Sequence, residues 1–186
     1  MTPPEAAAAA FVIRPSIDAD LPAIAAIYEH HVHFGLASFE ETPPDLAELA
    51  RRRGEVLAQE LPYLVADAGG RVLGYAYAAP HRIRSAYRFS VEDSIYVDPA
   101  AVRRGIGRAL LGTLLTRCAR QGYRQIVAVI GDSGNAGSIG LHERLGFRRV
   151  GLLPAIGFKH GRWVDSVLMQ RELGEGAATL PDQPTV

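Results

Sequence analysis

The stretch that decides the fold is residues 95–108, IYVDPAAVRRGIGR, which reads as a strand end, a loop and a helix start. Three β-favouring residues precede Asp98-Pro99, a pair that ends a strand. Beyond the loop, apolar residues recur every four positions, which predicts an amphipathic helix over Gly105–Gln121. The residues at this spacing are Ile106, Leu110, Leu114 and Cys118.

The glycines of this loop predict a site for a phosphate or pyrophosphate group. Gly105 and Gly107 let the backbone approach a ligand closely, and a helix start directs free N–H groups and a positive dipole end at one point. The dinucleotide fingerprint requires glycine where Leu110 stands, and a P-loop requires Gly-Lys-Ser/Thr, so neither motif is present. Three arginines add positive charge to the loop: Arg103, Arg104 and Arg108.

The rest of the chain predicts a mixed α/β sheet flanked by helices, in the order β-α-α-β-β-β-α-β-α-β-β. We expect one domain over residues 11–173, with flexible tails at 1–10 and 174–186. The expected strands are Phe11–Arg14, Tyr63–Ala68, Arg71–Ala79, Val91–Val97, Gln125–Ile130, Phe147–Leu153 and Trp163–Arg171. The other expected helices carry Leu21–Tyr28, run from Pro43-Pro44 towards Glu60, and span Gly137–Leu145.

Composition narrows the class of protein. The 186 residues carry 20 basic and 20 acidic side chains, and this zero formal charge argues against nucleic acid or an anionic membrane as a partner. The sequence contains no run of eighteen apolar residues, so a transmembrane helix is not predicted. Cys118 is the single cysteine, so an intrachain disulfide is excluded and a reducing, cytoplasmic location is expected. Two of the residues His30, His31 and His33 could share a helix face, but no third ligand has suitable spacing, so we expect no metal and interpret them as helix surface or pocket rim.

Three segments carry a family resemblance. Residues 102–108 resemble the Gln/Arg-x-x-Gly-x-Gly/Ala pyrophosphate motif of the GNAT superfamily of acyl-CoA-dependent N-acetyltransferases, although Val102 replaces the leading Gln/Arg. Residues 128–147 resemble its strand-Asn-helix-Leu-Gly-Phe segment. Together with Glu92–Val97 and Gly157–Asp165, they are similar to the phosphinothricin N-acetyltransferase branch, which includes methionine sulfone and methionine sulfoximine acetylases. The likeness implies a GNAT-like fold, a mostly antiparallel twisted sheet flanked by about four helices.

The resemblance implies acetyl-CoA as the acetyl donor, with its pyrophosphate held by backbone amides of the loop. Asn135 and Ser138 are expected to contact the pantetheine or sulfur end, and a backbone N–H of Tyr96 or Val97 is expected to meet the oxyanion. The implied cofactor-binding residues are Ile95, Tyr96, Val97, Arg103, Arg104, Gly105, Ile106, Gly107, Arg108, Asn135 and Ser138.

Two titratable residues are the candidates for catalysis. Acetyl transfer needs a neutral amine, and Glu92 is the candidate general base, as in the resembled branch; the alternative is a strand-end carboxylate paired with an arginine such as Arg88. His142 stands where the branch has an active-site histidine, which protonates the CoA thiolate or positions the amine; the alternative is a structural histidine. Cys118 lies mid-helix, so we expect direct transfer in a ternary complex.

The acceptor is expected to be the α-amine of a small amino acid analogue such as phosphinothricin, methionine sulfoximine or methionine sulfone. Arginines suit its carboxylate, although each taken singly also fits a surface charge. The candidate substrate-binding residues are Phe39, Glu40, Arg82, Arg84, Tyr87 and Val91. The alternatives are a peptide or ribosomal-protein N-terminus as acceptor, or a non-catalytic acyl-CoA sensor. The resemblance also implies a homodimer.

Overall fold

The computed structural model describes residues 10–181, which form a single seven-stranded sheet with the strand order β1-β2-β3-β4-β5-β7-β6. Of its six strand pairings, β4 with β5 is parallel and the other five are antiparallel. The expectation of a mostly antiparallel mixed sheet is thereby confirmed. The strands are β1 Val12–Pro15, β2 Tyr63–Ala68, β3 Arg71–Pro80, β4 Ser90–Val97, β5 Gln125–Gly131, β6 Arg148–Lys159 and β7 Arg162–Glu172.

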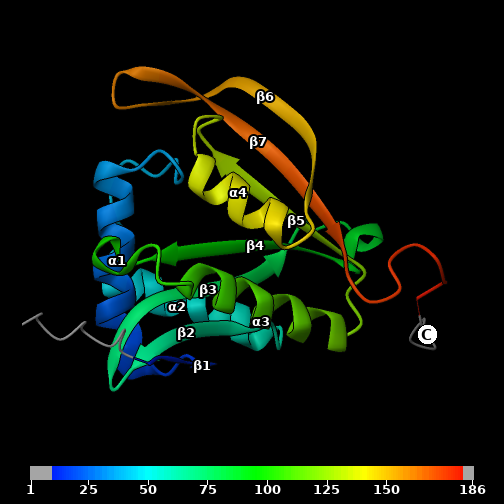
Figure 1. Ribbon diagram of the computed structural model, residues 1–186, viewed down its shortest axis with the longest axis horizontal. Coiled ribbons are helices and arrows are strands. Elements are labelled where there is room, and N and C mark those ends of the chain that lie inside the picture. The colour runs from blue at the N-terminus through cyan, green and yellow to red at the C-terminus, as the bar shows by residue number, and fades with distance from the viewer. Residues whose placement is uncertain (1–9, 182–186) are drawn as a thin grey trace, which may run out of the picture.

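Four α-helices cover the two faces of the sheet, as expected. They are α1 Leu21–Phe34, α2 Leu46–Ala58, α3 Ile106–Arg120 and α4 Ala136–Arg144. Figure 1 shows α3 and α4 in front of the sheet and α2 behind it. Three short 3-10 helices lie in the connections, at Asp18–Asp20, Ser85–Tyr87 and Pro99–Ala101. The order of strands and α-helices matches the order that the sequence predicts.

One strand boundary in the prediction was wrong. The sequence predicts a strand ending at Leu153, whereas β6 continues to Lys159. Its pairing with β7 shifts register between Leu153 and Gly157. Pro154 lies within this shift, and an edge strand tolerates proline where the ladder is interrupted, because proline has no N–H to donate.

The sheet divides where β4 and β5 stop pairing. The parallel ladder runs only from Ser90↔Gln125 to Asp93↔Ala128. Beyond that rung β4 continues along β3 as far as Val97, and β5 continues along β7 as far as Gly131. The two strands therefore diverge after Asp93, and α4 lies against β5 beside the opening (Figure 1).

Alternation along β4 sends successive side chains to opposite faces of the sheet. Asp93 is directed at α4, where it contacts His142. Tyr96 is directed at the other face, where its ring contacts Tyr28 of α1 at a centroid distance of 5.0 Å. By the same period of two, Glu92 shares the face of Tyr96 and not that of Asp93.

The predicted N-terminal tail, except Ala10, and the last five residues of the predicted C-terminal tail lie outside the described residues, which exclude 1–9 and 182–186. Within the described part of the C-terminal segment, Thr179 accepts a hydrogen bond from Arg124 at 3.1 Å. In residues 10–181, none of the helices has the length and apolar character needed to cross a membrane.

Candidate active site

A cleft of about 770 Å³ opens between the diverging strands. Every predicted cofactor-binding residue except Arg104 lines this cleft. Residues that the prediction did not include also line it: His31, Phe34, Gly35, Leu36, Ala37, Ala101, Val102, Asp132, Gly137, Leu141 and Arg144. The loop before α3, the strand β4 and the start of α4 therefore meet around one hollow.

The loop before α3 takes its shape from two glycines with different roles. Gly105 has a φ of +81°, in the left-handed region that glycine adopts readily, and α3 begins immediately after it. Gly107 lies within the first turn of α3, where an added Cβ would be 3.1 Å from the side chain of Leu141 in α4. Gly107 thus lets α3 and α4 approach at the cleft, next to the free N–H groups of the α3 N-terminus.

The charge of the cleft suits an anionic group at this end. Arg103 and Arg108 line it beside the α3 N-terminus, and Arg144 lines it from α4. A pyrophosphate at a helix N-terminus gains from the dipole, the free N–H groups and such side chains together. The residues present therefore fit the phosphate end of an acyl-CoA.

Glu92 lies on β4 one residue before the divergence, half-buried, with its Oε2 3.3 Å from Nδ1 of His81. Burial raises the pKa of Glu92, while the hydrogen bond and the charge of His81 act in the opposite direction. A carboxylate whose pKa lies above its ordinary range is a better proton acceptor. This suits the predicted general base.

His142 is fully buried, at 1% exposure. Its Nε2 lies 3.0 Å from Oδ2 of Asp93, its Nδ1 lies 2.8 Å from the carbonyl oxygen of Ser138, and its ring packs edge-on against Phe147. Burial alone would lower the pKa of His142, but the hydrogen bond and charge of Asp93 and the Ser138 carbonyl together raise it. His142 does not line the cleft, so its role in catalysis stays a prediction.

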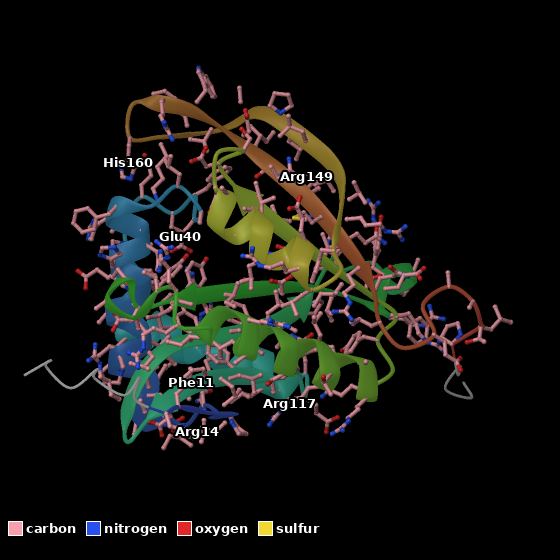
Figure 2. All side chains as sticks on the ribbon, viewed as in Figure 1. Phe11, Arg14, Glu40, Arg117, Arg149 and His160 are labelled. Carbon is pink, nitrogen blue, oxygen red and sulfur yellow. The ribbon has the colours of Figure 1, made fainter. Side chains whose placement is uncertain are left out.

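The loop between α1 and α2 covers one end of the sheet. Lys159 donates a hydrogen bond from Nζ to the Ser38 carbonyl at 2.7 Å, tying this loop to the end of β6. Phe39 fits between two glycines: an added Cβ would be 2.5 Å from its ring at Gly157 and 3.1 Å at Gly131. Glu40, on the same loop in Figure 2, accepts a hydrogen bond from Arg52 at 2.6 Å.

The remaining predicted substrate residues separate into two groups. Arg82, Arg84 and Tyr87 lie exposed in the segment after β3, and the Tyr87 ring is 5.8 Å from that of His81. Val91 is fully buried in the hydrophobic core, on the face opposite Glu92. The structure therefore connects Tyr87 with Glu92 through His81, and the charge of Arg82 acts on Glu92, whereas Val91 lies away from them.

Asp93 and His81 each contact a candidate catalytic residue, and neither was among the predicted site residues. In a strand, Asp93 lies on the face opposite Glu92, and its partner His142 is 49 residues away in the sequence. His31 was expected on the helix surface or at a pocket rim; it lines the cleft and contacts the Val97 carbonyl oxygen through Nε2 at 2.9 Å. Within residues 10–181, no group of three or more side chains of metal-ligating type is found.

Comparison with known proteins places the chain among acetyltransferases. It is 54% identical over 178 residues to phosphinothricin N-acetyltransferase of Alcaligenes faecalis, covering 96% of this chain and 90% of the relative. It is 45% identical over 162 residues to the L-methionine sulfoximine/L-methionine sulfone acetyltransferase of Pseudomonas aeruginosa strain PAO1, covering 87% of this chain and 94% of the relative.

A solved structure has a similar fold. The crystal structure of a GNAT superfamily phosphinothricin acetyltransferase from Sinorhizobium meliloti, in complex with AcCoA, matches with a TM-score of 0.90 and 50% identity, covering 93% of this chain and 94% of that one. The family model described as acetyltransferase (GNAT) family matches residues 24–147. The chain therefore belongs to the GNAT family of acetyltransferases.

Proposed function

We propose that this protein transfers the acetyl group of acetyl-CoA directly to the α-amine of a small amino acid analogue such as phosphinothricin, methionine sulfoximine or methionine sulfone. The observation that carries the proposal is the divergence of β4 and β5 after Asp93: the cleft begins on β4 at Ile95, three residues beyond Glu92 on the same strand. The two relatives named for these acceptors support the choice of acceptor.

The cleft fits the donor in size and chemistry. Its volume of about 770 Å³ lies in the range of ordinary ligand sites, and its arginines and the α3 N-terminus suit the pyrophosphate. Beyond Asp93, β4 has lost β5 as a neighbour, so backbone groups on that edge can pair with the amides of the pantetheine arm. The backbone N–H of Val97 would meet the developing oxyanion, because the N–H of Tyr96 lies on the β3 side of β4.

Glu92 would take the proton from the ammonium group of the acceptor, which frees the nitrogen lone pair for attack on the thioester carbon. An acyl-enzyme on the single cysteine is disfavoured by position and by charge state. Cys118 is fully buried in α3, and burial raises the pKa of its thiol to about 12, so it stays protonated. Direct transfer between donor and acceptor is the simpler chemistry.

The acceptor would lie between the α1–α2 loop and the segment after β3. Arg82 and Arg84 can offer guanidinium groups to a carboxylate, whose planar geometry they match. Phe39 and Glu40 lie on a loop that Lys159 anchors, so this side of the site is held in place. This arrangement favours a small anionic acceptor over a polypeptide chain.

We propose further that the protein is a homodimer formed through β6, at the edge of the sheet. An exposed edge strand rich in apolar side chains is typical of an interface. The exposed apolar residues of β6 and the start of β7 are Val150, Leu152, Leu153, Ile156, Phe158 and Trp163. Comparison of the wild type with Phe158→Glu by sedimentation tests whether the protein is a dimer.

The free, buried Cys118 supports a reducing cytoplasmic location.

Release of the CoA thiol from acetyl-CoA tests the function. The purified protein is assayed with L-phosphinothricin, L-methionine sulfoximine, L-methionine sulfone and a panel of peptides with free N-termini. Saturable turnover with a small analogue is expected. Turnover restricted to the peptides would identify a protein N-terminal acetyltransferase, whereas acetyl-CoA binding without turnover on any amine would identify a sensor.

A further inference from the structure

A second cavity, of about 50 Å³, lies at the point where β4 and β5 part. It shares four lining residues with the large cleft: Ala37, Ile95, Tyr96 and Ser138. Its other lining residues are Asp93, Ser94, Ala128, Val129, Ile130 and His142. The buried pair of Asp93 and His142 therefore borders a hollow that adjoins the donor cleft.

Asp93 has one satisfied and one unsatisfied oxygen. Its side chain is 2% exposed, and Oδ2 accepts from Nε2 of His142 at 3.0 Å. Oδ1 is buried, and among the described residues it has no hydrogen-bond partner. A buried carboxylate oxygen without a donor is costly, so it calls for an explanation. The 50 Å³ cavity is large enough for a water molecule that would supply this donor.

The contacts of His142 define its protonation. A carbonyl oxygen only accepts, so Nδ1 carries a hydrogen directed at Ser138, and an ionised Asp93 requires a second hydrogen on Nε2. The pair then holds a carboxylate and an imidazolium. The other titratable groups around it are the Cys118 thiol, which interacts with Asp93 from α3, and Glu92, which interacts with it from the opposite face of β4.

The hydroxyl of Ser138 connects this pair with the cleft. Its Oγ lies 3.5 Å from Nδ1 of His142, one helical turn away on α4, and Ser138 lines both the small cavity and the cleft. Carboxylate, imidazole and hydroxyl thus stand in the order that serves proton transfer to or from the hydroxyl in hydrolases.

We propose that Asp93, His142 and Ser138 form a proton relay, in which Ser138 donates its hydroxyl hydrogen to the departing sulfur of CoA. As the amine nitrogen forms its bond to the carbonyl carbon, the C–S bond breaks and its electron pair stays on sulfur. The Ser138 proton moves to that sulfur, and the Nδ1 proton of His142 replaces it on Oγ. His142 is left neutral, with Nε2–H still donating to Asp93, and solvent later returns the proton.

Three roles follow for this relay, which rests on the proposed function. Ser138 is a catalytic residue, because its hydroxyl would touch the reacting sulfur. His142 and Asp93 act through it, His142 as the proton reserve and Asp93 as a positioning residue that keeps the ring oriented and charged. The Ser138 carbonyl favours return of the proton to Nδ1 after each turnover.

The test compares Ser138→Ala, Ser138→Thr and Asp93→Asn with wild type, using an acceptor that the wild type acetylates. Ser138→Ala is expected to lower kcat about 100-fold, at the low end of general acid catalysis, with the KM for acetyl-CoA nearly unchanged, and Ser138→Thr to restore most of the rate. The matched control is Ser133→Ala, since Ser133 is an exposed serine just before α4 that donates to Asp165. It should keep the wild-type rate.

A pH profile and an NMR titration complete the test. Wild-type kcat should fall as pH rises through the raised pKa of His142, and Asp93→Asn should move that fall to lower pH. The ring nitrogen signals of His142 report the same change without any acceptor. Full kcat in Ser138→Ala, or an unmoved His142 titration in Asp93→Asn, would overturn the relay alone. No wild-type turnover with any amine would refute the proposed function, and the relay with it.

Discussion

Two neighbouring carboxylates on β4, Glu92 and Asp93, each meet a histidine, but in opposite surroundings. Glu92 faces His81 at 3.3 Å, with side chains that are 33% and 18% exposed. Asp93 faces His142 at 3.0 Å, with both side chains 2% exposed. The alternation of a strand places the two pairs on opposite faces of the sheet, and burial then separates their chemistry. The solvent-touching pair suits proton exchange with an acceptor, whereas the buried pair suits a fixed charge arrangement.

The largest expected difference is in the reaction rate. Glu92→Gln keeps the shape of the side chain but removes the base, so kcat should fall by about 10²–10⁴-fold near neutral pH. Steady-state assays with an acceptor that the wild type acetylates measure it. Glu143→Gln is the control, because Glu143 pairs with Arg149 on the surface. Wild-type turnover in Glu92→Gln would show that Glu92 is not the base.

The next difference is in stability. His142→Ala leaves the Asp93 carboxylate buried without its partner, which should cost about 3–5 kcal/mol in the free energy of unfolding. His81→Ala removes the partner of a more exposed carboxylate and should cost no more than about 1 kcal/mol. Urea unfolding of both variants measures the contrast. Equal losses in the two variants would mean that burial does not distinguish the pairs.

The pH dependence of stability separates the pairs by window. The pKa of His142 is raised in the folded state, so its contribution is complete below the unfolded value of about 6.5 and is lost as pH rises through the folded value. The pKa of Glu92 is raised too, but its contribution to stability is lost as pH rises from the unfolded value of about 4.5. Urea unfolding between pH 6 and 9 should show the loss from His142. Asp93→Asn should flatten that slope, and a slope that persists in this variant would argue against the pair as its source.

Local patterns predicted much of the fold and of the donor site. Residues 102–108 form the end of a loop and the first residues of α3, and their shape depends on their own backbone, so the roles of the glycines and arginines there could be predicted from the local sequence. The end of β6 could not be predicted in this way. Pro154 and Gly157 are signals for a loop, and the strand continues past them only because it pairs with β7 across an irregular register.

Local sequence patterns did not predict the two histidine pairs. His81 reaches Glu92 across the connection between β3 and β4, where the two strands pair as Ala79↔Glu92 and Pro80↔Val91. Asp93 reaches His142 only because α4 packs beside the divergence of β4 and β5. Pattern within an element predicts which face a side chain takes, but the partner on that face depends on packing between elements.

The smallest expected effect is the change in the pKa of Glu92 when His81 is replaced. The hydrogen bond and charge of His81 lower this pKa against the effect of burial, so His81→Gln should raise it further. Because Glu92 acts as a carboxylate, the acid limb of kcat/KM should move to higher pH, while the rate on the plateau above it changes by no more than about 3-fold.

The matched control for His81 is His33→Gln, since His33 forms an exposed pair with Glu29 one helical turn away on α1. Profiles of kcat/KM against pH for the two variants and the wild type measure the shift. The acid limb of His33→Gln should coincide with that of the wild type. An unmoved limb in His81→Gln would show that His81 does not influence the pKa of Glu92. The solvent-touching pair would then differ from the buried one in kind, because Asp93 raises the pKa of His142 whereas His81 would have no influence on the pKa of Glu92.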